Sequence, residues 1–216
     1  MLAANRTKQI QSQVDRAIDA ADQASWFLAE AQWLKALIAS RGRSDWSGMI
    51  QIVEGLRSAR RAIRRKALVR GSVRVVDDAI SETMELTAGR YLLQPPLVGA
   101  DARRLIQFGR EQEVPIAVIC REPRTQTGLI PIVAIAPGTT IRARIDPPSK
   151  ESQPSVAWFK TALDSIGEAA LDRIDPADGQ ERRIDALLGC LDAIPDYDPV
   201  YARLIGTLEE ATRSQN

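Results

Sequence analysis

The chain has 216 residues, 44% hydrophobic and 26% charged, an ordinary composition for one large domain or two small ones with a buried core. It contains no histidine, which excludes Ser/His/Asp and Cys/His catalytic systems and histidine-based zinc or di-iron sites within one chain. The net charge of +1 hides an asymmetry, because 13 acidic and 6 basic residues follow position 150, against 15 and 23 before it. The two parts therefore either dock on each other or leave a basic part for an acidic partner.

The N-terminal residues have the pattern of one long helix over residues 5–40. Its apolar residues recur every three or four positions, and alanine fills much of the resulting seam: Ile10, Val14, Ala17, Ala21, Ala24, Leu28 and Ala31. Small seam residues permit a close approach of a neighbouring helix. We interpret it as a helix of a bundle, with an intermolecular coiled coil as the alternative.

Two more helices are expected in the first part of the chain. Ser44 or Asp45 can cap one that ends near Val69, and a third covers residues 72–87. Because the connections are short, we predict a three-helix bundle over residues 1–89.

The middle of the chain, residues 90–150, has a different residue pattern. Paired prolines keep residues 90–99 extended, and a short helix follows. Runs rich in valine and isoleucine then predict three strands, at residues 114–122, 128–138 and 139–148. Their connections are too short for helical crossovers, so we expect a small antiparallel three-stranded sheet carrying one helix.

The last part, residues 151–216, is predicted to be an acidic helical segment that follows a linker. Proline and aspartate separate three helical patterns, at residues 156–173, 179–194 and 198–213. The whole chain is therefore expected to be α+β and mostly helical.

A basic stripe on the second helix is the main candidate for a binding surface. At 100° per residue, five side chains fall together opposite the apolar face: Arg57, Arg60, Arg61, Arg64 and Arg65. Arg142 and Arg144 alternate with apolar residues in the third strand and could extend the stripe. Such a stripe suits either phosphate groups or an acidic protein surface.

The chain itself offers an acidic counter-surface. Asp164, Glu168 and Asp172 recur every four residues on the helix predicted over 156–173. They could neutralise the arginines within the chain or across a dimer. A cation site there is weakly indicated, because surface carboxylates at this spacing are common and no phosphate-binding loop accompanies them.

The loop between the first two predicted strands is the place where an enzyme site would be expected. It is polar, it joins two buried strands, and it carries Arg121, Glu122, Arg124, Thr125 and Thr127. No catalytic motif accompanies these residues, so a carboxylate-based enzyme of unknown substrate is the weakest of three functional hypotheses.

The leading hypothesis is a non-catalytic interaction or scaffold protein that self-associates or binds a protein partner. The first alternative is a sequence-nonspecific nucleic-acid-binding protein that uses the same stripe. The longest apolar run, residues 129–136, is too short to span a membrane, and the N-terminal sequence lacks the apolar segment of a signal peptide. With only two cysteines, we expect a cytoplasmic protein without metal, cofactor or membrane partner.

Overall fold

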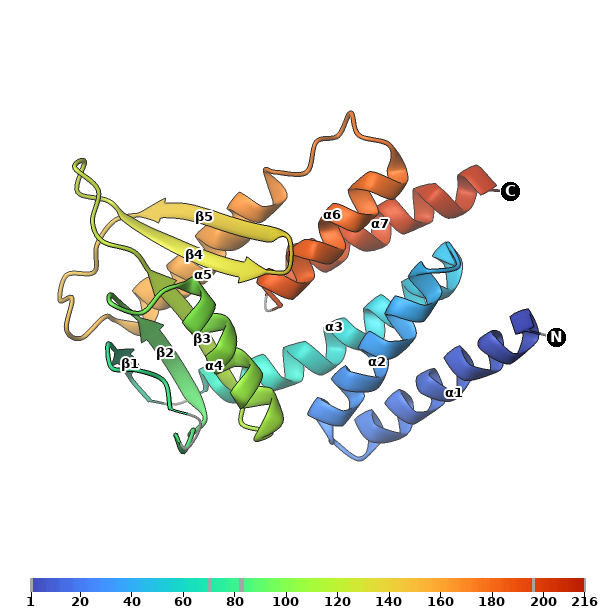
Figure 1. The fold of residues 1–216 in the computed structure, drawn as a ribbon, viewed down its shortest axis with the longest axis horizontal. Helices are drawn as coiled ribbons and strands as arrows, with labels where there is room; N and C mark the ends of the chain where they lie inside the picture. The colour runs from blue at the N-terminus through green and yellow to red at the C-terminus, as the bar shows by residue number, and fades with distance from the viewer. Residues whose placement is uncertain (1, 70, 82–83, 196, 216) are drawn as a thin grey trace.

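A computed structural model describes residues 2–69, 71–81, 84–195 and 197–215. The molecule is elongated, with a sheet at one end and helices that reach toward the other end, where both termini lie (Figure 1). No helix in the described ranges is both long enough and apolar enough to cross a lipid bilayer.

The described residues confirm an α+β chain that is mostly helical. Its helices are α1 Leu2–Asp22, α2 Trp26–Arg41, α3 Trp46–Leu68, α4 Gly99–Glu111, α5 Val156–Leu171, α6 Gln180–Ala193 and α7 Asp198–Gln215. Its strands are β1 Val73–Val76, β2 Gly89–Leu93, β3 Ile116–Arg121, β4 Ile130–Ala136 and β5 Thr139–Ile145.

The prediction of one helix over residues 5–40 is wrong, because the chain reverses between α1 and α2. Ala24 takes a left-handed backbone conformation with φ of 55°, which ends the first helix. The two helices then pack side by side (Figure 1) through alanines such as Ala17 and Ala36, both fully buried. The apolar spacing continues through the turn because both helices need an apolar face, so periodicity alone does not reveal the break.

Helix α3 begins where the sequence predicts. The carboxylate of Asp45 accepts a hydrogen bond from the backbone N–H of Gly48 at 3.0 Å, which satisfies a donor at the helix start. From there α3 runs past α2, along α7 and under β2 and β3, so it links the helical end of the molecule to the sheet.

The predicted third helix over residues 72–87 is wrong as well. Val73–Val76 instead form β1, which pairs in parallel with β2, Val73 lying opposite Arg90. Three of these four residues are valines, whose branched Cβ favours an extended backbone, and an adjacent strand is available in the folded chain. The three helices at the N-terminal end are therefore α1, α2 and α3.

The sheet differs from the predicted three-stranded antiparallel one. It has five strands in the order β1-β2-β3-β4-β5, of which β3, β4 and β5 are antiparallel, as predicted. β1, β2 and β3 are parallel to one another. The difference arises from α4, the helix predicted near residues 100–113, which connects β2 to β3 and brings the chain back in the same direction.

Helices cover both faces of the sheet. α3, α5 and α6 pack on one face, and α4 packs on β3 and β4 from the other. The larger core draws on all three segments predicted from sequence, for example through Leu56, Ile132 and Leu204, each fully buried. The division at residues 89 and 150 stays a prediction about how the chain is organised.

Candidate functional site

The arginine stripe of α3 is largely engaged within the chain. Arg57 donates from Nε to the Asp198 carboxylate at 2.7 Å, and Arg61 donates from Nη2 to the same carboxylate at 2.5 Å. The hydrogen bond from Arg57, and to a smaller extent that from Arg61, lowers the pKa of Asp198 to about 2. Partial burial acts in the opposite direction but is outweighed. The first residue of α7 is thereby fastened to the middle of α3.

Arg60 points inward and is only 3% exposed. Its Nε lies 2.7 Å from the Glu30 carboxylate on α2. Its Nη1 donates to the carbonyl of Leu191 at 2.9 Å and to the hydroxyl of Tyr201 at 3.0 Å. A single guanidinium therefore joins α2, α3, α6 and α7, and the stripe is not a continuous outer surface.

The other stripe residues lie in varied surroundings. Arg64 is half-buried and lines the pocket described below, while Arg65 is exposed. Arg142 and Arg144 are exposed on β5, which belongs to the sheet rather than to α3, and Arg142 pairs with Glu122 at 3.2 Å.

The acidic residues that pair with Arg57, Arg60 and Arg61 are Asp198 and Glu30, not the predicted ones. Asp164, Glu168 and Asp172 are exposed on α5 and its C-terminal end, close to Tyr197. Burial raises the pKa of the Tyr197 hydroxyl, and these three carboxylates raise it further. A sequence signal does mark Glu30, which is the one charged residue between Asp22 and Lys35.

The loop predicted as an enzyme site forms a surface ion-pair network. Glu151, from the predicted linker, accepts from Arg121 at 2.8 Å and also pairs with Arg124. The hydroxyls of Thr125 and Thr127 lie 2.9 Å apart. Glu122 pairs with Arg142 of β5, as described above.

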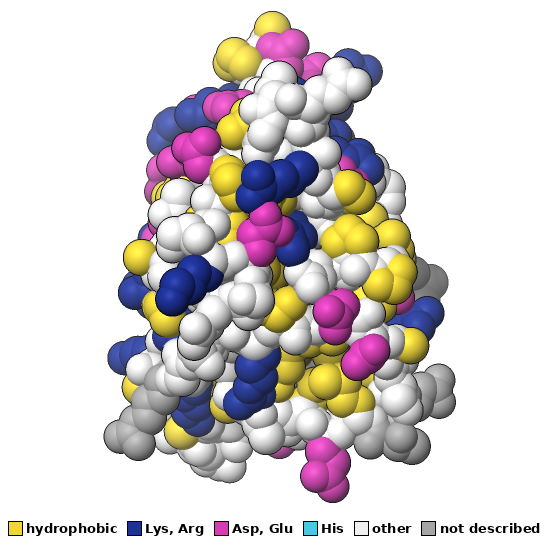
Figure 2. All heavy atoms as spheres, turned by 90° about the vertical axis from the view of Figure 1, so that its left-hand side faces the viewer, with side chains coloured by type: hydrophobic (Ala, Val, Ile, Leu, Met, Phe, Trp, Pro, Cys, Tyr) yellow, Lys and Arg dark blue, Asp and Glu magenta, His cyan; other side chains and the backbone are white. Residues whose placement is uncertain are grey.

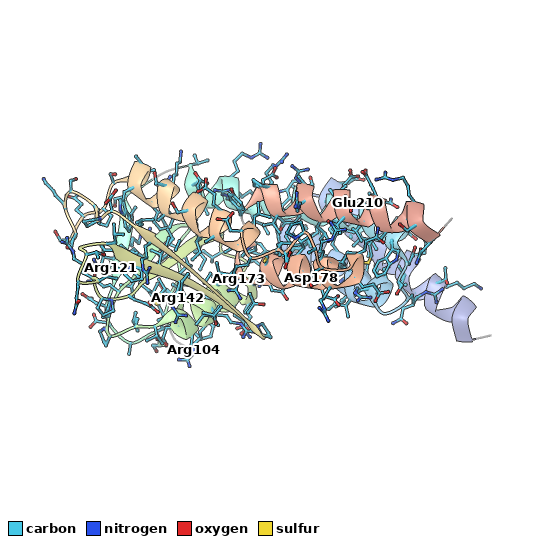
Figure 3. The ribbon with its side chains drawn as sticks, turned by 90° about the horizontal axis from the view of Figure 1, so that it is seen from above. Arg104, Arg121, Arg142, Arg173, Asp178 and Glu210 are labelled. Carbon is cyan, nitrogen blue, oxygen red and sulfur yellow. The ribbon has the colours of Figure 1, made fainter. Side chains whose placement is uncertain are left out.

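The ion pairs hold this loop to the linker. Figure 3 places the labelled Arg121 and Arg142 at the sheet, at the end of the molecule away from Glu210 on α7. On the sheet end seen in Figure 2, basic and acidic side chains are interspersed rather than gathered into one patch. None of the predicted loop residues lines the pocket described next.

A pocket lies where the helical end meets the sheet, and it has a volume of about 70 Å³. Its origin is in the strand pairing. In the described sheet, β3 and β4 pair only at Cys120–Val133 and Arg121–Ile132. Residues 116–119 of β3 and 134–136 of β4 are therefore not paired with each other. Side chains from both strands line the pocket, together with α2, α3, α4, α5 and the connection from α6 to α7.

The polar part of this pocket is a cluster of three charged residues from three helices. The Glu30 carboxylate accepts from Arg60 and also from Arg110 of α4, whose Nη2 lies 3.1 Å away. Burial alone would raise the pKa of Glu30, but the two arginines lower it overall, so the carboxylate is ionised. An ionised, doubly paired carboxylate is a poor general acid or base and a good structural partner for cations.

A second hollow, of about 190 Å³, is a groove between α2 and α6 with α3 as its floor. Leu34, Leu37 and Ile38 line it from α2, and Leu188 and Leu191 line it from α6. Ile38 is 74% exposed, more than the other large hydrophobic residues at the described surface. Ile38 therefore presents apolar surface to solvent at the groove, whereas Leu37 and Leu191 inside it are almost fully buried.

The remaining reactive groups give no separate site. Both cysteines are buried, and burial, followed by the charges of Glu122 and Asp101, raises the pKa of Cys120 to about 12. Within the described ranges, no group of three or more cysteine, aspartate or glutamate side chains is arranged to hold a metal ion. Comparison with family models, curated proteins and solved structures finds no match for this chain.

Proposed function

We propose that this chain is a non-catalytic interaction protein that self-associates through the groove between α2 and α6. The observation that carries the proposal is Ile38, a large apolar side chain that is mostly exposed at the rim of an apolar groove. An exposed apolar side chain beside an apolar hollow favours a protein contact there, because its removal from water is the main driving force of association.

A second copy of the chain is the occupant that the surface fits best. Ile38 is a protrusion beside a hollow of about 190 Å³. Under a two-fold axis each copy would place its Ile38 in the groove of the other, so one surface serves both copies.

The charges beside the groove support the same arrangement. Lys35 on α2 lies one helical turn before Ile38 and is exposed, while Asp192 on α6 lines the opposite rim and is also exposed. A two-fold axis that places α2 of one copy against α6 of the other brings these opposite charges together. Arg41, which also lines the groove, is already bound to Asp185 at 2.6 Å.

The ion pairs of the arginine stripe weaken the nucleic-acid alternative. It needs an open run of arginines, whereas Arg57, Arg60 and Arg61 are paired with Asp198 and Glu30. A carboxyl group that acts as a general acid needs a raised pKa, and that of Glu30, the carboxylate in the pocket, is lowered.

The test is sedimentation velocity over a range of protein concentrations, with Ile38→Glu as the variant and Leu28→Glu as its control. Leu28 lies on the same helix, is 49% exposed and does not line the groove. We expect the wild type and Leu28→Glu to be dimeric and Ile38→Glu to be monomeric, with unchanged circular dichroism. A wild type that stays monomeric, or an Ile38→Glu variant that still dimerises, would overturn the proposal.

A further inference from the structure

The pocket between the helical end and the sheet combines apolar walls with a buried cationic cluster. Its walls are mostly aliphatic, with Ile63, Ile106, Val118 and Ile166 among them. Pockets that are mainly apolar and carry a few convergent polar groups are the usual form of small-molecule sites. The walls therefore favour a ligand with an apolar body.

The net charge of the cluster favours a ligand of negative charge. Arg60 and Arg110 both bind the single carboxylate of Glu30, so the three ion-paired residues together carry a formal charge of +1. One further monovalent anion would make the set neutral.

A donor of the cluster is left without an acceptor from the protein. In the part of the chain that the structure describes, Nη2 of Arg60 is buried and has no hydrogen-bond partner, although Arg60 is only 3% exposed. A buried guanidinium donor without an acceptor is unfavourable, and a carboxylate oxygen could accept from Nη2, the one nitrogen of Arg60 that Glu30, Leu191 and Tyr201 leave unbonded.

From these observations we infer that the pocket binds a small organic monocarboxylate with an apolar tail, its carboxylate on Arg60 and Arg110 and its tail between β3, β4 and α5. A phosphate ion fits less well, because it carries more charge and hydration than aliphatic walls can replace. No residue lines both this pocket and the groove between α2 and α6, so this inference does not depend on the proposed self-association.

The test is isothermal titration of the full chain with straight-chain, branched and aromatic carboxylates, including 3-methylbutanoate and benzoate. Benzamide, which has the shape of benzoate without its charge, and inorganic phosphate are the reference compounds. We expect at least one carboxylate to bind, and benzamide and phosphate to bind about tenfold more weakly or not at all. Methyl signals of Ile63, Ile106 and Ile166 should shift in the NMR spectrum, while that of Ile10 on α1 should not.

Arg110→Gln and Arg104→Gln form the matched pair of variants. Both residues are on α4, but Arg104 lies outside the pocket and is 58% exposed, and Figure 3 labels it. We expect Arg110→Gln to weaken carboxylate binding about tenfold and Arg104→Gln to leave it unchanged. Leu163→Trp, which narrows the pocket from α5 without changing its charge, should also weaken binding.

Three results would overturn the inference: no carboxylate binds at millimolar concentration, benzamide or phosphate binds as well as the carboxylates, or Arg110→Gln behaves like Arg104→Gln. Thermal unfolding of each variant shows that it is folded before it is titrated.

Discussion

The carboxylate of Glu30 lies 2.7 Å from Nε of Arg60, although the two residues belong to different helices and each is almost completely buried. Because Arg60 also bonds to α6 and α7, this pair connects the N-terminal hairpin to the C-terminal helices. The same carboxylate accepts from Arg110 and so reaches α4 beside the sheet. The pair thus lies where the three parts of the chain meet.

Glu30→Gln should be strongly destabilising. The amide keeps the shape of the side chain but removes the charge that compensates Arg60, and breaking a buried ion pair in this way costs about 3 kcal/mol or more. Chemical denaturation of the two proteins measures the difference in free energy of unfolding. Glu209→Gln, at an exposed position of α7, is the control and should change it little. If Glu30→Gln lowers the free energy of unfolding no more than the control does, the pair adds nothing to stability.

Asp198 should make stability depend on pH in the acid range. Its pKa is lowered from 3.8 to about 2 in the folded chain, so its contribution is present above pH 3.8 and is lost as the pH falls toward 2. The side chain is 39% exposed, and solvent therefore limits the effect of Asp198→Asn at neutral pH to about 1 kcal/mol.

The measurement is the denaturation midpoint between pH 2 and pH 6 for wild type, Asp198→Asn and the control Asp164→Asn, which changes an exposed carboxylate of α5. We expect the wild type and the control to lose more stability on acidification than Asp198→Asn does. Equal acid dependence in all three proteins would contradict the assignment.

Two glycine-to-alanine substitutions in helices should have opposite signs. Alanine is favoured over glycine in a helix by up to about 1 kcal/mol. At Gly206 of α7 no neighbouring atom lies within 4 Å of the added Cβ, so Gly206→Ala should stabilise the protein by about that amount. At Gly55 of α3 the added Cβ would overlap the indole ring of the buried Trp33.

Because an overpacked core typically costs 1–3 kcal/mol, we expect about 1 kcal/mol of net destabilisation for Gly55→Ala. Thermal unfolding monitored by circular dichroism compares the two variants directly. A Gly55→Ala protein as stable as Gly206→Ala would mean that α2 and α3 can separate at Trp33 without loss.

Local patterns were enough to predict most of the helices and the antiparallel part of the sheet. Asp45, one of the two expected candidates, caps α3, because a cap depends only on residues within one turn. The first predicted strand, at residues 114–122, contains β3, which is the third of five strands in the sheet. β1 was missed because its pairing with β2 in parallel is a long-range contact that no local pattern records.

The sequence by itself determined which residues are charged or apolar and, within a few residues, where most helices begin and end, because these properties depend on neighbours along the chain. Only the tertiary structure decided which acid meets which arginine. Periodicity placed Arg57, Arg60 and Arg61 on one face of a helix, but their partners, Asp198 and Glu30, come from distant segments. The pocket has the same origin, since it exists where β3 and β4 cease to pair and side chains of several elements converge.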